Sequence, residues 1–155
     1  MFYNYILNIA RKAAGLAIKA GGSAVAKIAN VITITIDGDL IPVTAKDIDL
    51  TNVTSIGSNG QLVTSAFILT DQFQTVLTVY ADTAGAITLG KGLEVSKHVH
   101  YNSVQIDKSQ NATKAIIGYI YLKNETAATF TGGTTAIDAS GMTALFTDTY
   151  SPLGI

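Results

Sequence analysis

Residues 31–38 read Val-Ile-Thr-Ile-Thr-Ile-Asp-Gly, and this stretch sets the fold class of the chain. The isoleucines alternate with threonine, which is the period of a β-strand that buries one face. Asp37-Gly38 is a residue pair preferred in two-residue hairpin turns. Leu40 to Thr44 should return as an edge strand, because Pro42 has no backbone N–H to donate. The stretch therefore predicts an antiparallel hairpin.

The sequence after residue 38 remains rich in Thr, Val, Ile and Gly. We expect a polar loop over 48–61 and a turn at Gly90-Lys91-Gly92. Further strands are expected at 62–69, 73–80, 86–89, 93–101, 115–122, 126–131, 134–138 and 142–147. Residues 115–122 are apolar on both faces, which predicts a central strand buried on two sides. Six or more short strands at this spacing indicate an antiparallel β-sandwich or barrel over residues 31–155.

Residues 1–30 follow a different pattern. Polar residues recur every three or four positions from Asn4 to Asn30, which predicts an amphipathic α-helix from about Tyr3 to Asn30. Gly21-Gly22 is a weak point, since glycine is a poor helix former. The predicted organisation is therefore a helical arm over 1–30 followed by a β domain over 31–155.

One face of the predicted arm is a candidate docking interface. Small residues recur at Ala13, Ala17 and Gly21, and this spacing would let another helix approach closely. The alternative is that they pack the arm on its own β domain. The candidate interface residues are Ile6, Ile9, Ala13, Leu16, Ala17, Ala20, Gly21 and Ala24.

Charge is scarce and unevenly distributed. Charged residues make up 14% of the chain, which favours a surface that is hidden against other subunits. The arm carries four cations and no acid, whereas the remainder carries six Lys against eleven acidic residues. A basic segment of this kind suits anionic lipid or an acidic neighbour. Nucleic-acid binding is disfavoured, because the chain has one Arg and no Trp.

No residue pattern indicates catalysis. His98 and His100 lie two residues apart on a predicted strand, with Glu94 as a possible third metal ligand. Two solvent-facing histidines explain the same pattern more simply. The chain has no Cys, which excludes disulfides and thiolate metal sites, and it has no nucleophile elbow. We therefore expect a protein that is not an enzyme and has no cofactor or metal.

Residues 115–122 (Ala-Ile-Ile-Gly-Tyr-Ile-Tyr-Leu) and 130–139 (Phe-Thr-Gly-Gly-Thr-Thr-Ala-Ile-Asp-Ala) carry a family resemblance. Together they resemble the β module of small tailed-bacteriophage virion proteins, including head-decoration and head-fibre proteins, over residues 73–148. One departure is the absence of Pro from 101–114. The resemblance implies a virion component without enzymatic activity, assembled in the host cytoplasm. It also implies a homo-oligomer, with a trimer favoured, and contact with other virion proteins such as the major capsid protein.

The sequence thus predicts a virion structural protein that oligomerises through its β domain and is anchored by its helical arm. One alternative is a peripheral membrane protein whose basic arm lies flat on anionic lipid without crossing the bilayer. Another is a carbohydrate-binding or adhesion module, which predicts a shallow aromatic groove.

Overall fold

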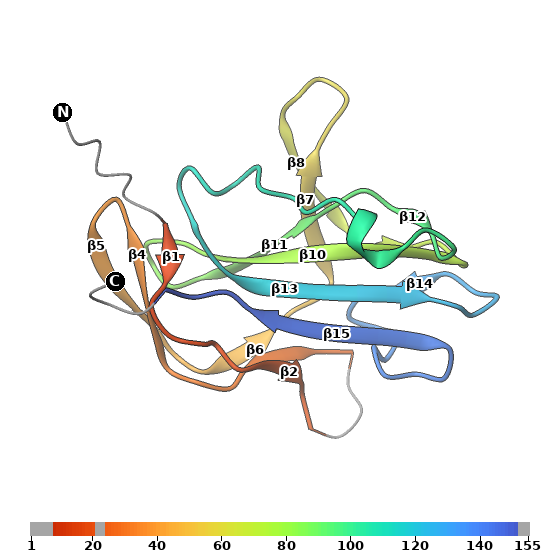
Figure 1. Ribbon diagram of the computed structural model, residues 1–155, viewed down its shortest axis with the longest axis horizontal. Coiled ribbons are helices and arrows are strands. Elements are labelled where there is room, and N and C mark those ends of the chain that lie inside the picture. Colours follow the sequence, from red (N-terminus) through yellow and green to blue (C-terminus); the bar gives the residue numbers. More distant parts are fainter. Residues whose placement is uncertain (1–7, 21–23, 152–155) are drawn as a thin grey trace.

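The computed structural model describes residues 8–20 and 24–151, and Figure 1 shows a mainly β molecule. These residues form fifteen strands and a single 3₁₀ turn, η1 (Tyr101–Ser103), and contain no α-helix. The predicted β class is therefore confirmed, and the predicted long N-terminal helix is wrong.

The largest sheet has 10 strands, with β13 (Ala115–Asn124) and β10 (Phe73–Ala81) at its centre. The strand order is β5-β4-β1-β13-β10-β11-β7-β8, while β12 pairs with β10 and β15 pairs with β13. The other strands are β1 (Ile9–Ala10), β4 (Ile32–Ile36), β5 (Asp39–Val43), β7 (Asn52–Ile56), β8 (Leu62–Ala66), β11 (Ile87–Lys91), β12 (Val95–Ser96) and β15 (Met142–Asp148).

β13 is a central strand, as its apolar sequence predicts. One edge pairs with β10 over almost its whole length. The other edge is shared: β1 pairs with its start in parallel, at Ile9 and Ile116, and β15 pairs with the rest in antiparallel register. The parallel pairs β1–β13 and β11–β7 show that the sheet is mixed, where the sequence indicated a purely antiparallel arrangement.

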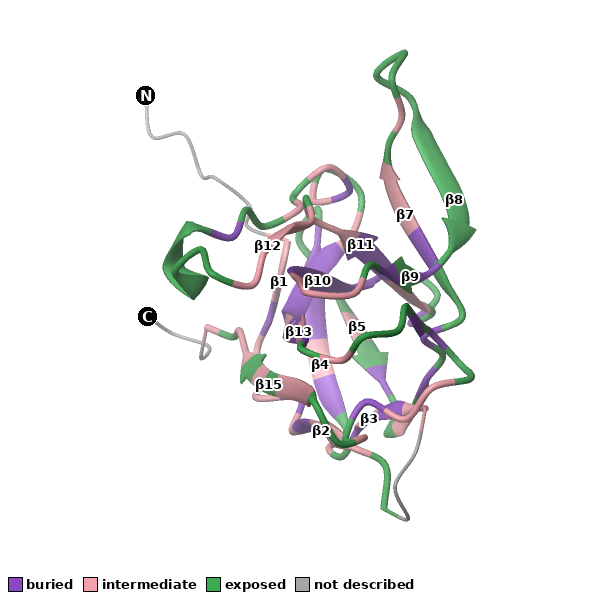
Figure 2. Cartoon of the chain, turned by 90° about the vertical axis from the view of Figure 1, so that its right-hand side faces the viewer, coloured by how far each residue is buried: buried purple, intermediate pink, exposed green. Residues whose placement is uncertain are grey.

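Two small sheets complete the fold. One has the order β2-β3-β6, and the other pairs β9 with β14. Their strands are β2 (Leu16–Ile18), β3 (Ala26–Ile28), β6 (Lys46–Ile48), β9 (Ile68–Leu69) and β14 (Phe130–Thr131). Side chains from all three sheets, such as Ile28, Leu77 and Phe130, belong to one hydrophobic core. Figure 2 shows this buried interior around β10, β13 and β4.

The β4–β5 hairpin matches its prediction. Ile32, Ile34 and Ile36 are buried, and β5 lies at the end of the sheet. Asp37 and Gly38 both have positive φ, of 51° and 90°, which is the backbone of the tight turn that joins two twisted strands.

The N-terminal segment forms strands because the sheet offers it edges to pair with. Ile9 and Ala10 in β1 fill the gap between β4 and the start of β13. Gly15 has a φ of +65°, which an α-helix does not allow, and it separates β1 from β2. Ala10 and Ala14 are fully buried in the core. Tertiary pairing thus overrides a helical spacing that rests largely on small residues.

Four local predictions are also wrong. The expected loop over 48–61 contains β7. Gly90-Lys91-Gly92 is the end and continuation of β11 rather than a turn. The expected strand over 93–101 is reduced to β12 and followed by η1, and 134–138 forms no strand.

Candidate functional site

A β-hairpin projects from one end of the large sheet. β7 and β8 pair from Asn52 with Ala66 to Ile56 with Leu62, and Gly57 donates to the Gln61 carbonyl at 2.8 Å to close the tip. A single residue pair, Thr54 with Gly90, joins β7 to β11. Figure 1 shows the hairpin standing away from the rest of the molecule. It is therefore a protrusion anchored mainly at its base.

The outer edge of β8 has no strand partner within the described residues. Every residue of β8 is exposed, as Figure 2 shows. Leu62 and Val63 are 50% and 47% exposed, and Ile56 on β7 is 60% exposed. Residues 50–70 contain no charged side chain. The protrusion thus combines an unpaired backbone edge with exposed apolar side chains and no charge.

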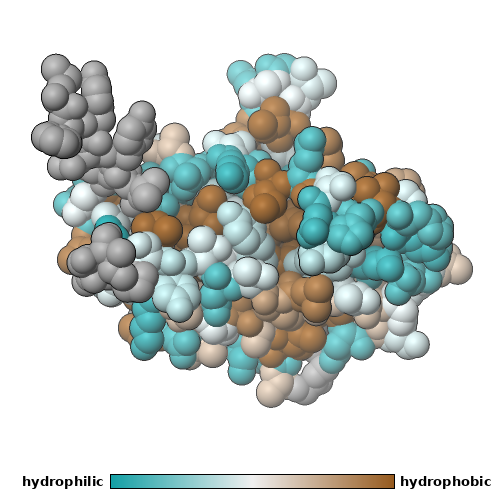
Figure 3. All heavy atoms as spheres, in the orientation of Figure 1, coloured by the Kyte–Doolittle hydropathy of each residue, from teal (hydrophilic) through white to brown (hydrophobic). Residues whose placement is uncertain are grey.

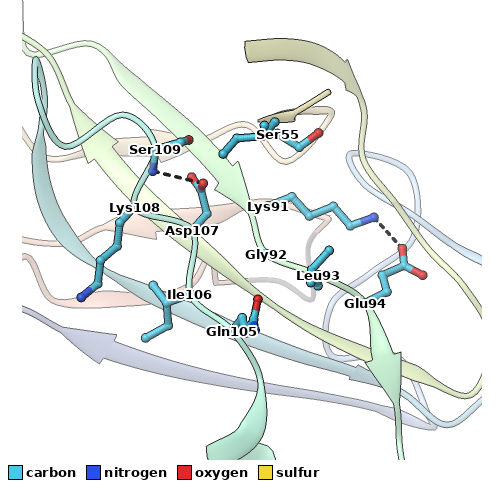
Figure 4. Close-up of a pocket in the computed structure, with 11 residues that line it drawn as sticks. Ser55, Lys91, Gly92, Leu93, Glu94, Gln105, Ile106, Asp107, Lys108 and Ser109 are labelled. Carbon is cyan, nitrogen blue, oxygen red and sulfur yellow. Dashed lines mark hydrogen bonds and ion pairs between the residues drawn. The ribbon is translucent and has the colours of Figure 1, made fainter. Parts of the chain in front are cut away.

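A cavity of about 450 Å³ lies at the foot of this hairpin. Its walls come from β7, the end of β11 and residues 105–109, as Figure 4 shows. Ile56, Leu93 and Ile106 contribute apolar, exposed side chains to it. Figure 3 shows hydrophobic surface at the base of the hairpin. The cavity therefore extends the apolar surface of the hairpin onto the body.

Two of the charged groups that line the cavity, Lys91 and Glu94, are paired with each other. Lys91 forms an ion pair with Glu94 and also donates to the Ile68 carbonyl at 2.8 Å. Burial raises the pKa of Glu94, but the hydrogen bonds from Lys91 and Thr70, with the charge of Lys91, outweigh burial and hold that pKa below its usual value.

Residues 97–114, between β12 and β13, leave the sheet and fold back over the outer face of β10. We call this segment the excursion. The Asp107 carbonyl accepts hydrogen bonds from the Thr78 hydroxyl at 2.6 Å and the Tyr80 hydroxyl at 2.8 Å. Lys114 donates to Thr88 on β11 at 2.9 Å. Burial, followed by the Asp107 charge, raises the pKa of Tyr80 well above its usual value, so the hydroxyl stays protonated and keeps donating.

Gly90, in β11, and Gly92, just after it, explain why residues 97–114 lie so close to the sheet. A Cβ at Gly90 would lie within 1.9 Å of the Asp107 carboxylate and 2.8 Å of the Tyr80 ring. A Cβ at Gly92 would lie 2.2 Å from the backbone oxygen of Gln105. Without side chains, these two glycines leave room for residues 105–107 to cross close to the strand. The glycines therefore serve this close approach and do not form the predicted turn.

The predicted histidine pair does not form a metal site. His98 and His100 are both exposed, and the His100 ring stacks on Tyr101 with centroids 4.9 Å apart. The His100 Nδ1 accepts the backbone N–H of Asn102 at 3.3 Å, and Glu94 is engaged by Lys91. The described residues hold no group of three or more His, Cys, Asp or Glu side chains that could bind a metal ion.

The predicted docking residues do not lie together on a helix face. Leu16 is buried in β2, and Ile9 pairs with two strands in β1. Ala17 is partly buried in β2. The remaining described members are Ala13 and Ala24, which are partly buried, and Ala20, which is exposed; Ile6 and Gly21 lie outside the described residues.

The sequence predicted a strand over 62–69, which contains β8, but it placed β7 in a loop and so missed the hairpin. Two signals could have located it: the β-branched residues of 51–56, and the run over 50–70 that lacks any charge.

No protein-family model, curated protein or solved structure matches this chain. In the part of the chain that the structure covers, no helix has the length and apolarity needed to span a bilayer.

Proposed function

We propose that this chain is a non-enzymatic structural subunit of a virion, and that it assembles with further copies of itself through the β7–β8 hairpin. The observation that carries the assembly is the unpaired, uncharged edge of β8. An exposed strand edge presents a row of backbone donors and acceptors that another chain can pair with.

The two ends of the large sheet differ in a way that supports this assignment. β5, at one end, carries Asp39 and Pro42, and both are features that keep a sheet edge from pairing with another chain. β8, at the opposite end, carries neither a charge nor a proline. Because proteins normally guard exposed edges, the unguarded edge of β8 is best explained by a partner that covers it.

A second copy of the chain is the partner that fits the hairpin. An uncharged protrusion creates no repulsion when identical copies meet. The exposed apolar side chains of Leu62, Val63 and Ile56 would be buried when a second copy contacts the hairpin. The apolar lining of the neighbouring cavity would be buried in the same contact. The low charge of the whole chain agrees with subunits that hide surface against each other.

The virion context rests on the resemblance of residues 115–122 and 130–139 to the β module of tailed-phage virion proteins. From it we also propose a trimer and contact with other virion proteins such as the major capsid protein. The membrane alternative required an amphipathic helix over residues 1–30, and the described part of that segment forms strands instead.

The mass of the full chain in solution tests the assembly. Sedimentation velocity should find an oligomer for the wild type and a monomer for Leu62→Lys, which places a charge on the β8 edge. Leu40→Lys is the matched control: Leu40 lies on β5 and is 59% exposed, against 50% for Leu62. The control should remain oligomeric. A wild type that stays monomeric, or a Leu62→Lys variant with unchanged mass, would refute assembly through the hairpin.

A further inference from the structure

A groove of about 320 Å³ lies on the outer face of the large sheet, away from the hairpin edge. Its floor comes from β10, β13 and β15, and one wall comes from η1 and the residues after it. It is lined by Val76, Tyr101, Asn102, Val104, Ile106, Tyr119, Tyr121 and Thr147. Three of the seven tyrosines of the chain therefore meet in one groove.

The tyrosine rings present both a flat face and an edge. Tyr101, on η1, is 58% exposed, and its ring meets that of Tyr121 edge to face with centroids 6.3 Å apart. The His100 ring stacks behind Tyr101. Tyr119 lies two residues before Tyr121 on β13, so both side chains are on the same face of the sheet. An exposed aromatic ring thus stands over two half-buried ones.

The floor of the groove is fixed before any ligand arrives. The Tyr121 hydroxyl donates to Gln74 Oε1 at 2.6 Å. Gln74 is buried, and its Nε2 donates to the carbonyls of Ser96 at 2.8 Å and Val99 at 2.6 Å. This chain of hydrogen bonds holds the Tyr121 ring and the start of the excursion in one position. A preorganised site loses less conformational entropy on binding.

The chemistry of the lining selects an uncharged ligand. Among the described residues, no acidic or basic side chain lines the groove. Its polar groups are the hydroxyls of the tyrosines and Thr147 and the amide of Asn102. Burial raises the pKa of both Tyr119 and Tyr121, so these hydroxyls stay neutral at physiological pH. A ligand that fits this lining must have an apolar face that packs on the tyrosine rings. It must also have hydroxyl groups that bond to the hydroxyl and amide groups of the groove.

We propose that this tyrosine groove binds a neutral saccharide. The C–H face of a sugar ring packs on the exposed ring of Tyr101, and its hydroxyls bond to Asn102, Thr147 and the tyrosine hydroxyls. The volume of about 320 Å³ lies at the lower end of the range for small-molecule sites and suits one or two sugar units. The groove and the cavity beside the hairpin share one lining residue, Ile106, and otherwise use different residues.

Retention of the full chain on insoluble neutral polysaccharides tests the proposal. The probes are cross-linked dextran, galactomannan, cellulose and chitin, with dextran sulfate as the anionic counterpart. Retention should occur on at least one neutral polymer and should persist at roughly 1 M salt, because no charge is involved. Tyr101→Ala should weaken it at least about tenfold, since the exposed stacking face is lost. Tyr150→Ala should leave it unchanged, because Tyr150 is 50% exposed but does not line the groove.

Four results would overturn the proposal. Two concern binding itself: retention on none of the neutral polymers, and equal retention of Tyr101→Ala and wild type. The third is stronger retention on dextran sulfate than on dextran. The fourth is displacement by an oligoproline peptide, a class of ligand that also docks in aromatic grooves. Sedimentation of Tyr101→Ala separates this site from the hairpin. A variant that loses both its oligomeric mass and its retention would show that the groove is a subunit contact, which also refutes saccharide binding.

Discussion

Replacement of Gly92 by alanine should destabilise the protein by forcing the 97–114 excursion away from the sheet. The new Cβ would lie 2.2 Å from the Gln105 backbone oxygen and 3.2 Å from that of Val76. Ordinary contact begins at 3.4 Å, so the Gln105 backbone must retreat by roughly 1 Å. Both obstacles are backbone atoms, which cannot rotate away as a side chain can.

The expected cost has two parts. Overpacking of this kind costs about 1–3 kcal/mol. Two residues farther along the chain, the Asp107 carbonyl accepts the Thr78 and Tyr80 hydroxyls, and each buried group that loses its partner adds about 1–3 kcal/mol. If one of these hydrogen bonds is lost, we expect a total of about 2–6 kcal/mol. At about 2–4 °C per kcal/mol, this lowers the unfolding midpoint of a chain this size by roughly 4–24 °C.

Urea unfolding followed by far-UV circular dichroism measures this cost. Gly60→Ala is the reference, because Gly60 has a φ of +77° and nothing within 4 Å of its would-be Cβ. It should cost only the backbone strain, about 1–2 kcal/mol. A Gly92→Ala variant no less stable than Gly60→Ala would refute the argument that the excursion depends on contact at this glycine.

Two further predictions concern other contacts. Gly118→Ala should cost about 1–3 kcal/mol in the same urea assay, because its Cβ would lie 2.4 Å from the Thr147 backbone oxygen and 2.4 Å from the Leu16 side chain; a cost well below about 1 kcal/mol would contradict the packing of β2 over β13. The folded-state pKa of Glu94 is lowered, so the stability it contributes is present above pH about 4.5 and is lost as pH falls through that lowered value. Glu94→Gln should therefore lose less stability between pH 7 and pH 3 than the wild type does, measured by thermal unfolding. Glu125→Gln should change this pH dependence less, since its ion pair with Lys123 is exposed and screened by water; equal effects of the two substitutions would count against the Lys91 contact.

The part of the fold that the sequence predicts is the part where the hydrophobic pattern is clear. The isoleucines of β4 bury one face, so their period identifies the strand. The unbroken apolar run of β13 identifies a strand buried on both faces. The turn at Asp37-Gly38 is identified by residues that tolerate positive φ. These features are local, and local reasoning finds them.

The candidate surfaces were harder to predict because they depend on contacts far apart in the chain. Gly90 and Gly92 suggest a turn when only their neighbours are considered. Their role becomes visible once residues 105–107 are seen to cross the strand. The tyrosine groove likewise joins Tyr101 to Tyr119 and Tyr121 through an excursion whose path the sequence does not specify.

The charge asymmetry of the sequence has an internal explanation in the structure. The cations of the first thirty residues suggested a basic arm that docks onto an acidic partner. In the structure, an acidic group of the same chain binds one of these cations. Lys19 forms an ion pair with Asp47 on β6. Lys27 on β3 lies opposite Asp47 in strand register. Arg11 donates to the Thr35 hydroxyl at 2.7 Å. Arg11 and Lys19 are thus engaged within the chain, so the proposed subunit contact rests on the uncharged hairpin and not on a basic arm.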